Sequence, residues 1–222
     1  MPRLDDLLRR LERFYGPQPR PPRDPFTLFV WEVLSPHSTP KKRDAALAAL
    51  KKIPALTPDS MHRAPQKTLV DAVALAGPYG ELRLRSLKIG VDHFRRAPGL
   101  PAIIRGPIAP ARRALKGLPQ MGEAGAYRML LFTADHAVLP VDARVARTAC
   151  RLGYGERDDN FTRMARGVRE AVARELPAEP DAYRRAFVYL SHHGASACTE
   201  ANPHCTVCPI LDECPEGKKR VS

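Results

Sequence analysis

Four of the five cysteines in this chain lie within one short stretch, CTEANPHCTVCPILDEC, residues 198–214. They are Cys198, Cys205, Cys208 and Cys214, separated by six, two and five residues. Thiolates grouped in this way bind zinc or an iron–sulfur cluster, or they pair as disulfides. Disulfides are rare in the cytosol, which disfavours that alternative for a cytosolic protein. Spacing in general does not separate zinc from an iron–sulfur cluster. The fifth, Cys150, lies in a helical pattern and is expected to be a small core residue.

Asp142 is a second group with chemical potential, in the stretch PVDARVARTACRLG, residues 140–153. An aspartate directly before a helical pattern is typical of an N-cap, worth about 1 kcal/mol. The start of a helix also keeps a carboxylate ionised. Such a carboxylate could stabilise a positive charge that develops in a substrate, or orient an attacking water. The capping and catalytic interpretations are compatible.

A turn between two helical patterns has the sequence LPQMGEAGA, residues 118–126. Glycine allows close approach of a backbone to a phosphate, and the N–H groups that open the next helix point at an anion. An ordinary corner between helices is the alternative. The candidates in this turn to contact an anion such as a phosphate are Leu118, Pro119, Gln120, Met121, Gly122 and Ala124.

The elements that position these residues are predicted to be helices. Apolar residues recur every three or four positions, Pro and Gly separate the segments, and strand patterns are nearly absent. The predicted helices cover 4–14, 26–34, 41–53, 67–77, 79–96, 111–118, 123–136, 142–153, 159–176 and 181–198, with a loop at 97–110. Fold class is therefore predicted to be all-α.

Composition favours a polyanionic partner. The 222 residues include 36 Lys and Arg against 24 Asp and Glu, a net charge of +12. Cationic side chains bind nucleic acid by releasing counterions from phosphates, although a basic solvated surface is the alternative. No apolar run approaches the roughly 18 residues of a membrane span, and the N-terminus does not resemble a signal peptide. We expect a cytoplasmic protein with no membrane partner.

The cysteine spacing resembles the [4Fe–4S] loop of the endonuclease III family of DNA glycosylases. The preceding HGASAC, residues 193–198, has the His-Gly that precedes the first ligand in that family. The turn at 118–126 resembles its helix–hairpin–helix motif, LPGVGxxTA, and the Asp142 segment resembles VDTHVxRV. The stretch DPFTLFVWEVLSPHST, residues 24–39, resembles an early buried helix of the family. The resemblance thus covers nearly the whole chain.

This resemblance implies two helical domains with a DNA-binding groove between them. Residues 21–136 would form a six-helix barrel with the hairpin at about 112–134. Residues 1–20 and 137–222 would form the cluster domain, in which the four cysteines at 198–214 bind [4Fe–4S]. Asp142 would be the catalytic carboxylate. His37 falls where the family often has a glutamine that fills the gap left by a flipped base.

Departures from the family pattern bear on the reaction. Ala124 replaces the lysine that attacks the sugar in bifunctional members, and alanine cannot form an imine. Lys116 is nearby in sequence but lies in the preceding helix. Gln120 replaces the first hairpin glycine. Glu32 lies one residue from the position of a base-protonating glutamate in adenine-removing relatives, and an exposed helix residue or a buried ion-pair partner is the alternative.

The predicted function is therefore a monofunctional, weakly active DNA glycosylase of base excision repair. It would act as a monomer, flip a damaged or mispaired base from duplex or single-stranded DNA, and hydrolyse its N-glycosidic bond. One alternative is a catalytically impaired protein that binds DNA or damage. A further alternative is a bifunctional glycosylase and lyase that uses a displaced lysine.

Overall fold

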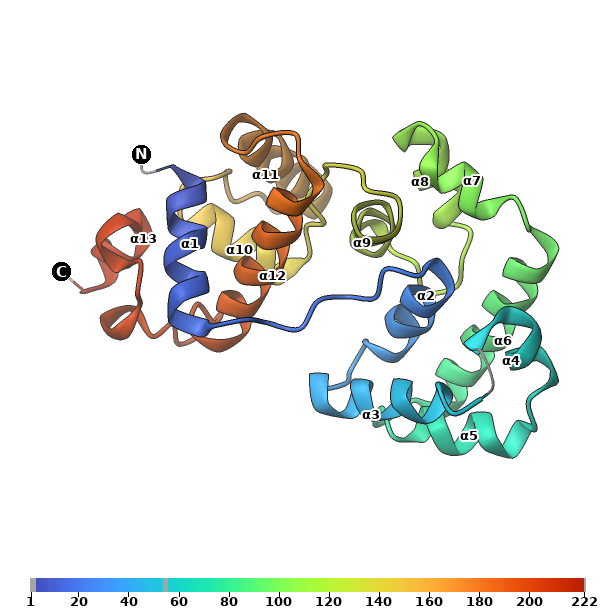
Figure 1. The fold of residues 1–222 in the computed structure, drawn as a ribbon. Coiled ribbons are helices and arrows are strands. Elements are labelled where there is room, and N and C mark those ends of the chain that lie inside the picture. Colours follow the sequence, from blue (N-terminus) through green and yellow to red (C-terminus); the bar gives the residue numbers. More distant parts are fainter. Residues whose placement is uncertain (1–2, 54–55, 222) are drawn as a thin grey trace. The chain divides into compact units, whose positions relative to one another are not determined.

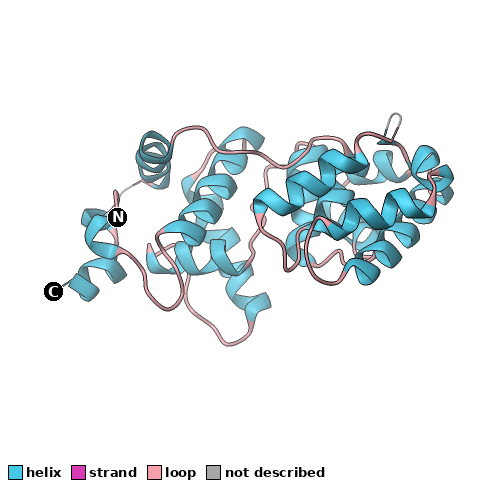
Figure 2. Cartoon of the chain, turned by 90° about the horizontal axis from the view of Figure 1, so that it is seen from below, coloured by secondary structure: helices cyan, strands magenta, loops and turns pink. Residues whose placement is uncertain are grey.

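The computed structural model describes residues 3–53 and 56–221, and every regular element in these ranges is a helix (Figure 2). The predicted all-α fold class is confirmed. The chain divides into two compact units, Pro21–Ala134 and the combination of Met1–Arg20 with Asp135–Ser222. Each unit has its own core.

The unit Pro21–Ala134 contains eight helices among its described residues (Figure 1). They are α2 Pro25–Leu34, α3 Pro40–Leu50, α4 Pro58–Arg63, α5 Gln66–Ala74, α6 Gly80–Arg96, α7 Leu100–Arg105, α8 Ile108–Leu115 and α9 Glu123–Thr133. Proline occupies the first position of α2, α3 and α4, where its missing N–H costs nothing. The preceding Asp24, Thr39 and Thr57 cap these helices with their side chains. Proline therefore marks helix starts in this unit.

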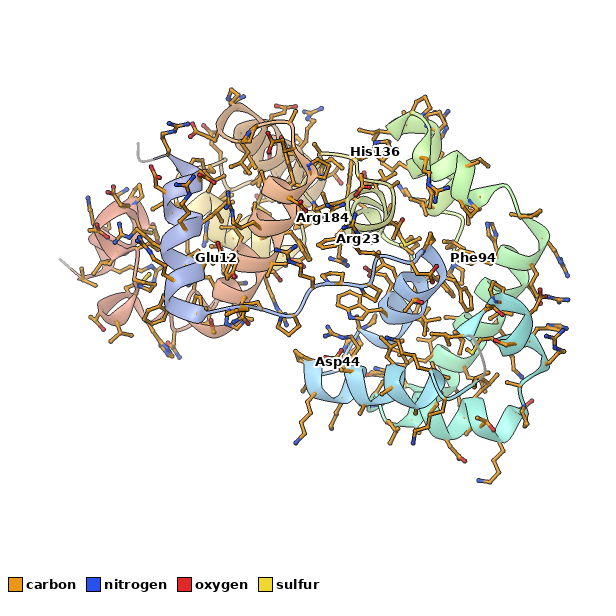
Figure 3. All side chains as sticks on the ribbon, in the orientation of Figure 1. Glu12, Arg23, Asp44, Phe94, His136 and Arg184 are labelled. Atoms are coloured by element: carbon orange, nitrogen blue, oxygen red, sulfur yellow. The ribbon has the colours of Figure 1, made fainter. Side chains whose placement is uncertain are left out.

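Helix α2 is the centre of this core. The rings of Phe26 and Phe94 lie 5.3 Å apart, and those of Phe29 and Phe94 lie 5.5 Å apart (Figure 3). A Cβ at Gly90 of α6 would lie 1.9 Å from the Phe29 ring. Glycine at position 90 is what allows the Phe29 ring to lie against α6.

The predicted loop at 97–110 is wrong. Residues Leu100–Arg105 form α7, and α8 begins at Ile108. Leu100 and Ile104 are buried four residues apart, so one turn of helix places both in the core. Pro101 does not prevent this because it lies in the first turn.

The other unit consists of seven described helical segments. They are α1 Leu4–Tyr15, α10 Ala143–Arg151, α11 Phe161–Glu175, α12 Pro180–Ser196, the 3₁₀ turns η2 Cys205–Val207 and η3 Leu211–Glu213, and α13 Pro215–Val221. Helix α1 contacts α12, and the Tyr189 hydroxyl donates to Glu12 Oε1 at 3.2 Å (Figure 3). Segments from both ends of the chain therefore share this core.

Helix α1 buries its leucines but not Phe14, the last apolar residue of the same three- and four-residue spacing. Leu4, Leu7, Leu8 and Leu11 are buried. Phe14 is 59% exposed. Tyr15, four residues after Leu11, is the residue at the end of α1 that bonds to α12, where its hydroxyl lies 2.8 Å from His193 Nδ1.

Within the described ranges, no helix combines the length and the apolar character needed to cross a membrane.

Candidate functional site

Asp142 caps the N-terminus of α10. Its Oδ1 accepts hydrogen bonds from the backbone N–H groups of Arg144 and Val145, both at 3.0 Å. The side chain is half-buried, and its carboxylate lies at the positive end of the helix. The predicted N-cap is confirmed. The arrangement supplies a fixed negative charge beside a helix start.

The packing of α10 against α12 holds Asp142 in place. Val145, Ala146 and Ala149 of α10 are buried, and α10 contacts α12 closely. A Cβ at Gly194 of α12 would lie 2.8 Å from Thr148 Oγ1 and 3.0 Å from the Arg144 carbonyl oxygen. The glycine of the His-Gly pair therefore permits the close approach of the two helices.

Two arginines of α10 bind the start of the cysteine loop. Arg147 donates to the carbonyls of Gly194 at 2.6 Å and Cys198 at 2.9 Å. Arg151 is buried and donates to the Thr199 carbonyl at 2.6 Å and to Cys198 Sγ at 3.3 Å. Sequence reasoning missed both residues. Their spacing of four along a helix that follows a candidate catalytic residue was the available signal.

The four thiols of the loop lie near one another. Burial raises the pKa of Cys208 to about 11; a backbone hydrogen bond at Ile210 opposes this, and the other three thiols of the loop add to it. The backbone N–H of Gly217 donates to Cys214 Sγ at 3.2 Å. All five cysteines are free of disulfides. Cys150 stands apart, half-buried, with its thiol 3.5 Å from the Glu156 carbonyl.

The loop fits a four-thiolate group in its donors. Four sulfur atoms from one segment affect each other's ionisation, and a buried guanidinium and a backbone N–H donate to two of them. Such donors stabilise thiolates and orient them as ligands. No three His, Cys, Asp or Glu side chains of the described chain converge closely enough to hold a metal ion. The donor chemistry is therefore present without a formed coordination sphere.

His193 lies beside these thiols. Its Nε2 is 3.7 Å from Cys208 Sγ. Burial and, to a smaller extent, the neighbouring His192 lower the pKa of His193 to about 4. The imidazole is therefore neutral at physiological pH, consistent with a buried structural side chain.

In the other unit, the hairpin joins α8 to α9. Leu118 and Met121 are buried, so their side chains pack inward and only backbone atoms are left for a ligand. Gln120 and Gly122 are exposed. Gly122 precedes α9, and α9 has no side-chain cap among the described residues. The first N–H groups of α9 are therefore suited to an anion.

Gln120 has a left-handed backbone with a φ of +58°. Glycine adopts that conformation without steric cost, whereas other residues do not. Its side-chain amide donates to Ser86 Oγ of α6 at 2.7 Å. The family's glycine at this position thus has a physical reason, and here a hydrogen bond holds the turn in its place.

Glu32 is a buried ion-pair partner. Its two carboxylate oxygens accept from Arg128 Nε at 2.5 Å and Nη2 at 2.9 Å. A Cβ at Gly125 would lie 3.3 Å from Glu32 Oε2. The buried-pair alternative for Glu32 is confirmed. A carboxylate that accepts from Nε and Nη2 of one guanidinium is held in a bidentate pair, with both of its oxygens bonded to Arg128.

Ala124 lies half-buried in the first turn of α9. The neighbouring Glu123 accepts from Arg112, and Lys116 Nζ lies 3.3 Å from Glu123 Oε2. Burial alone would raise the pKa of Glu123, but hydrogen bonds from Arg112 and Lys116 lower it below its usual value. Lys116 is thus engaged in an ion pair with Glu123.

His37 is exposed, with a left-handed φ of +52°. Its ring centroid lies 5.0 Å from that of Tyr79. The structure therefore presents His37 as one of a pair of surface aromatic rings rather than as an isolated side chain.

Comparison with known proteins finds sequence relatives over most of the chain. No protein-family model matches the chain. It is 27% identical over 209 residues to endonuclease III of Treponema pallidum, which covers 91% of this chain and 92% of the relative. It is 24% identical over 193 residues to endonuclease III of Sulfolobus acidocaldarius, with 86% and 82% covered.

Solved structures give the same fold. A non-covalent endonuclease III–DNA complex matches with a TM-score of 0.74 and 22% identity, covering 97% of this chain and 95% of that one. A thermostable thymine-DNA glycosylase matches with a TM-score of 0.72 and 18% identity, covering 96% of both chains. The fold is that of the helix–hairpin–helix DNA glycosylases. In sequence, the chain is similar to the two endonuclease III proteins, in line with the resemblance that its motifs carry.

Proposed function

We propose that this protein is a monofunctional DNA glycosylase of the endonuclease III type, which hydrolyses the N-glycosidic bond of a flipped, damaged or mispaired base. Relatives and solved structures matched over most of the chain support the general class, a DNA glycosylase of this fold. One observation carries the finer proposal. Asp142 is held as a carboxylate at a helix start, while Ala124 stands in place of the family's attacking lysine.

Asp142 would act on the sugar by electrostatics. Cleavage of an N-glycosidic bond leaves positive charge on the sugar, and a fixed carboxylate stabilises that charge. It would also orient the water that attacks the anomeric carbon. The two backbone N–H groups that hold Oδ1 would keep the carboxylate oriented through both steps.

Lyase chemistry is disfavoured because Lys116, the lysine nearest to Ala124 in sequence, is bound in an ion pair. Imine formation needs a neutral amine. Lys116 pairs instead with Glu123, a carboxyl whose pKa is already lowered by Arg112 and Lys116 against the effect of burial. A bifunctional reaction through a displaced lysine therefore receives no support from this region.

The loop at 198–214 would carry a [4Fe–4S] cluster through Cys198, Cys205, Cys208 and Cys214. The cluster would fix the fold of the loop, with Arg147 and Arg151 holding its first ligand. This cluster assignment is tested by measuring iron, zinc and acid-labile sulfide in the protein after aerobic or anaerobic purification. Zinc without sulfide would contradict it.

The DNA partner would meet the backbone of the hairpin and the first N–H groups of α9. Gly122, exposed and without a side chain, leaves these groups accessible to a phosphate. His37 would contact the site of the flipped base. The net charge of +12 would add non-specific attraction.

A base-release assay over duplex and single-stranded lesion substrates tests the activity, with Asp142→Asn as the matched variant. Release by the wild type and its loss in Asp142→Asn would support the mechanism. Release that is unaffected by the substitution would contradict it. Borohydride trapping on an abasic duplex addresses the lyase separately, because no covalent adduct is expected.

A binding protein without excision is the second candidate. It is favoured by Gln120, whose side chain occupies a turn where the family has glycine, and by the locked Glu32–Arg128 pair. Tight, salt-sensitive duplex binding with no released base from any substrate would establish it over the enzyme.

A further inference from the structure

Two surface turns of the unit Pro21–Ala134 hold aromatic side chains on a disfavoured backbone. His37 has a φ of +52° and Tyr79 a φ of +69°. Residues other than glycine rarely adopt this left-handed region, and they persist there only where the surroundings hold them. Both side chains are exposed, and their ring centroids are 5.0 Å apart at an interplanar angle of 58°. The two turns are 42 residues apart in sequence, so a tertiary contact is needed to fix one relative to the other.

One buried arginine of α6 joins the turns. Arg83 is 2% exposed. Its Nη2 donates to the carbonyl of Pro36 at 2.5 Å, and its Nη1 donates to the carbonyl of Gly77 at 3.1 Å and to that of Pro78. The carbonyls at 36 and 78 belong to the residues directly before the two aromatic ones. Since a guanidinium is planar with fixed donor directions, it sets one turn relative to the other.

The environment of Arg83 is unusual for a structural cation. The guanidinium is bound by backbone carbonyls and has no carboxylate within ion-pair distance among the described residues, and its Nε is buried without an acceptor. Burial lowers the pKa of Arg83 below its usual value. Burying a cation without a counter-charge costs stability. A role for the geometry of the two turns in binding accounts for this loss of stability.

We propose that Arg83 is a positioning residue for DNA binding, which holds the rings of His37 and Tyr79 as a pair that stacks on an unpaired base. The proposal rests on the proposed DNA-binding function and deepens it. Aromatic side chains stack on nucleic-acid bases with little regard to sequence. Two rings fixed at one spacing lose less conformational freedom on binding than two independent side chains.

The test is the affinity of Arg83→Lys for a duplex with 2-aminopurine opposite a tetrahydrofuran abasic analogue, which has no base to release. Lysine keeps the charge but lacks the planar fork. We expect binding to this duplex to weaken about tenfold, with loss of the 2-aminopurine quenching that stacking produces. Binding to an undamaged duplex should change by less than about twofold, because phosphate contacts are unaffected. Arg85→Lys, an exposed arginine of the same helix, is the matched control and should bind both duplexes as the wild type does.

A mutant cycle separates positioning from general stability. In a His37→Ala and Tyr79→Ala background, Arg83→Lys should cause no further loss of affinity, because the rings through which it acts are gone. An equal loss in both backgrounds would overturn the proposal. If Arg83→Lys fails to fold, the single ring variants decide. If the two rings act as a pair, His37→Ala or Tyr79→Ala alone should lose nearly as much affinity as the double variant. Losses that add up from the two single variants would overturn the proposal.

Failure of this inference is distinguishable from failure of the proposed function. A wild-type protein that binds neither duplex refutes both. A wild-type protein that prefers the abasic duplex, with Arg83→Lys binding equally well and quenching equally, refutes only the role of Arg83.

Discussion

Two helix starts in this protein are built in opposite ways. Helix α10 begins at Asp142, whose carboxylate takes two backbone N–H groups. Helix α9 begins after Gly122 and has no side-chain cap in the described structure. A capped start keeps a negative charge in place, whereas an uncapped one offers N–H groups and a positive dipole end to an anion. The first suits a cationic transition state, and the second suits a phosphate.

The carboxylates near these starts differ as well. Asp142 is half-buried, and its Oδ1 accepts from backbone N–H groups two and three residues away. Glu32, beside Gly125 of α9, is buried and bonded bidentately to Arg128, 96 residues along the chain. Under the proposed function, the first carboxylate acts in the chemistry and the second stabilises the fold. The following substitutions test this comparison.

The largest effect is expected from Asp142→Asn. Asparagine caps a helix about as well as aspartate, so thermal stability should be nearly unchanged. Base release should fall on the order of 10²–10⁴-fold, because the fixed negative charge is lost. Single-turnover excision and calorimetric unfolding measure the two effects. A similar loss of both activity and stability would mean that Asp142 is only a cap.

Glu32→Ala should lower the free energy of unfolding by about 3–5 kcal/mol, because it leaves the Arg128 guanidinium buried without its partner. Denaturant unfolding measures this. The matched control is Glu170→Ala on α11, since Glu170 and Arg166 form an exposed pair with a separation of 3.9 Å. Little change is expected for the control. Equal stability of both variants would contradict the assignment of Glu32 to the core.

Gly122→Asp would convert the start of α9 into a start like that of α10. The backbone there is extended, and no atom lies within 4 Å of an added Cβ, so the side chain fits. We expect a gain in stability of about a few tenths of a kcal/mol. Duplex affinity should fall on the order of tenfold from like-charge repulsion with phosphate. Gly122→Asn, which caps without charge, should bind more tightly than Gly122→Asp.

The smallest effect concerns the left-handed turn at Gln120. Gln120→Gly relieves the backbone but loses the bond to Ser86, so the net change should stay within about 1 kcal/mol. Gln120→Ala loses the same bond and keeps the strain. It should therefore be less stable than Gln120→Gly by about 1 kcal/mol. A reversed order in thermal unfolding would show that position 120 does not need a left-handed residue.

Much of the fold could be predicted because its signals are local. Leucines at three- and four-residue spacing predicted α1, and the helical patterns predicted α2 and α3 from residues 26 and 41, one residue after each begins. The misses were also local but ambiguous. The segment 97–110 contains five prolines or glycines before α8 and still forms α7, because burial of Leu100 and Ile104 outweighs the weak propensity of a six-residue helix.

In the candidate site, too, residues within one short segment were predicted and partners from distant segments were not. The cysteine set, the hairpin and Asp142 were found from spacing, because each lies within one short segment. The partners that hold them were not found, because they come from distant segments. Arg151 meets Cys198 across 47 residues, and Arg83 meets Pro36 across the same separation. The four-residue spacing from Arg147 was a weak local signal for Arg151, whereas no local pattern distinguishes Arg83 from the exposed arginines.

The sequence by itself determined which residues begin and line the helices, and it placed the thiols and the capping aspartate, because those properties depend on neighbours within a turn or a loop. Only the tertiary structure decided that Glu32 is paired, that Gln120 and His37 have left-handed backbones, and that Arg83 joins two turns. Those outcomes depend on which segments pack together. Burial then forces each polar group to find a partner wherever the fold supplies one.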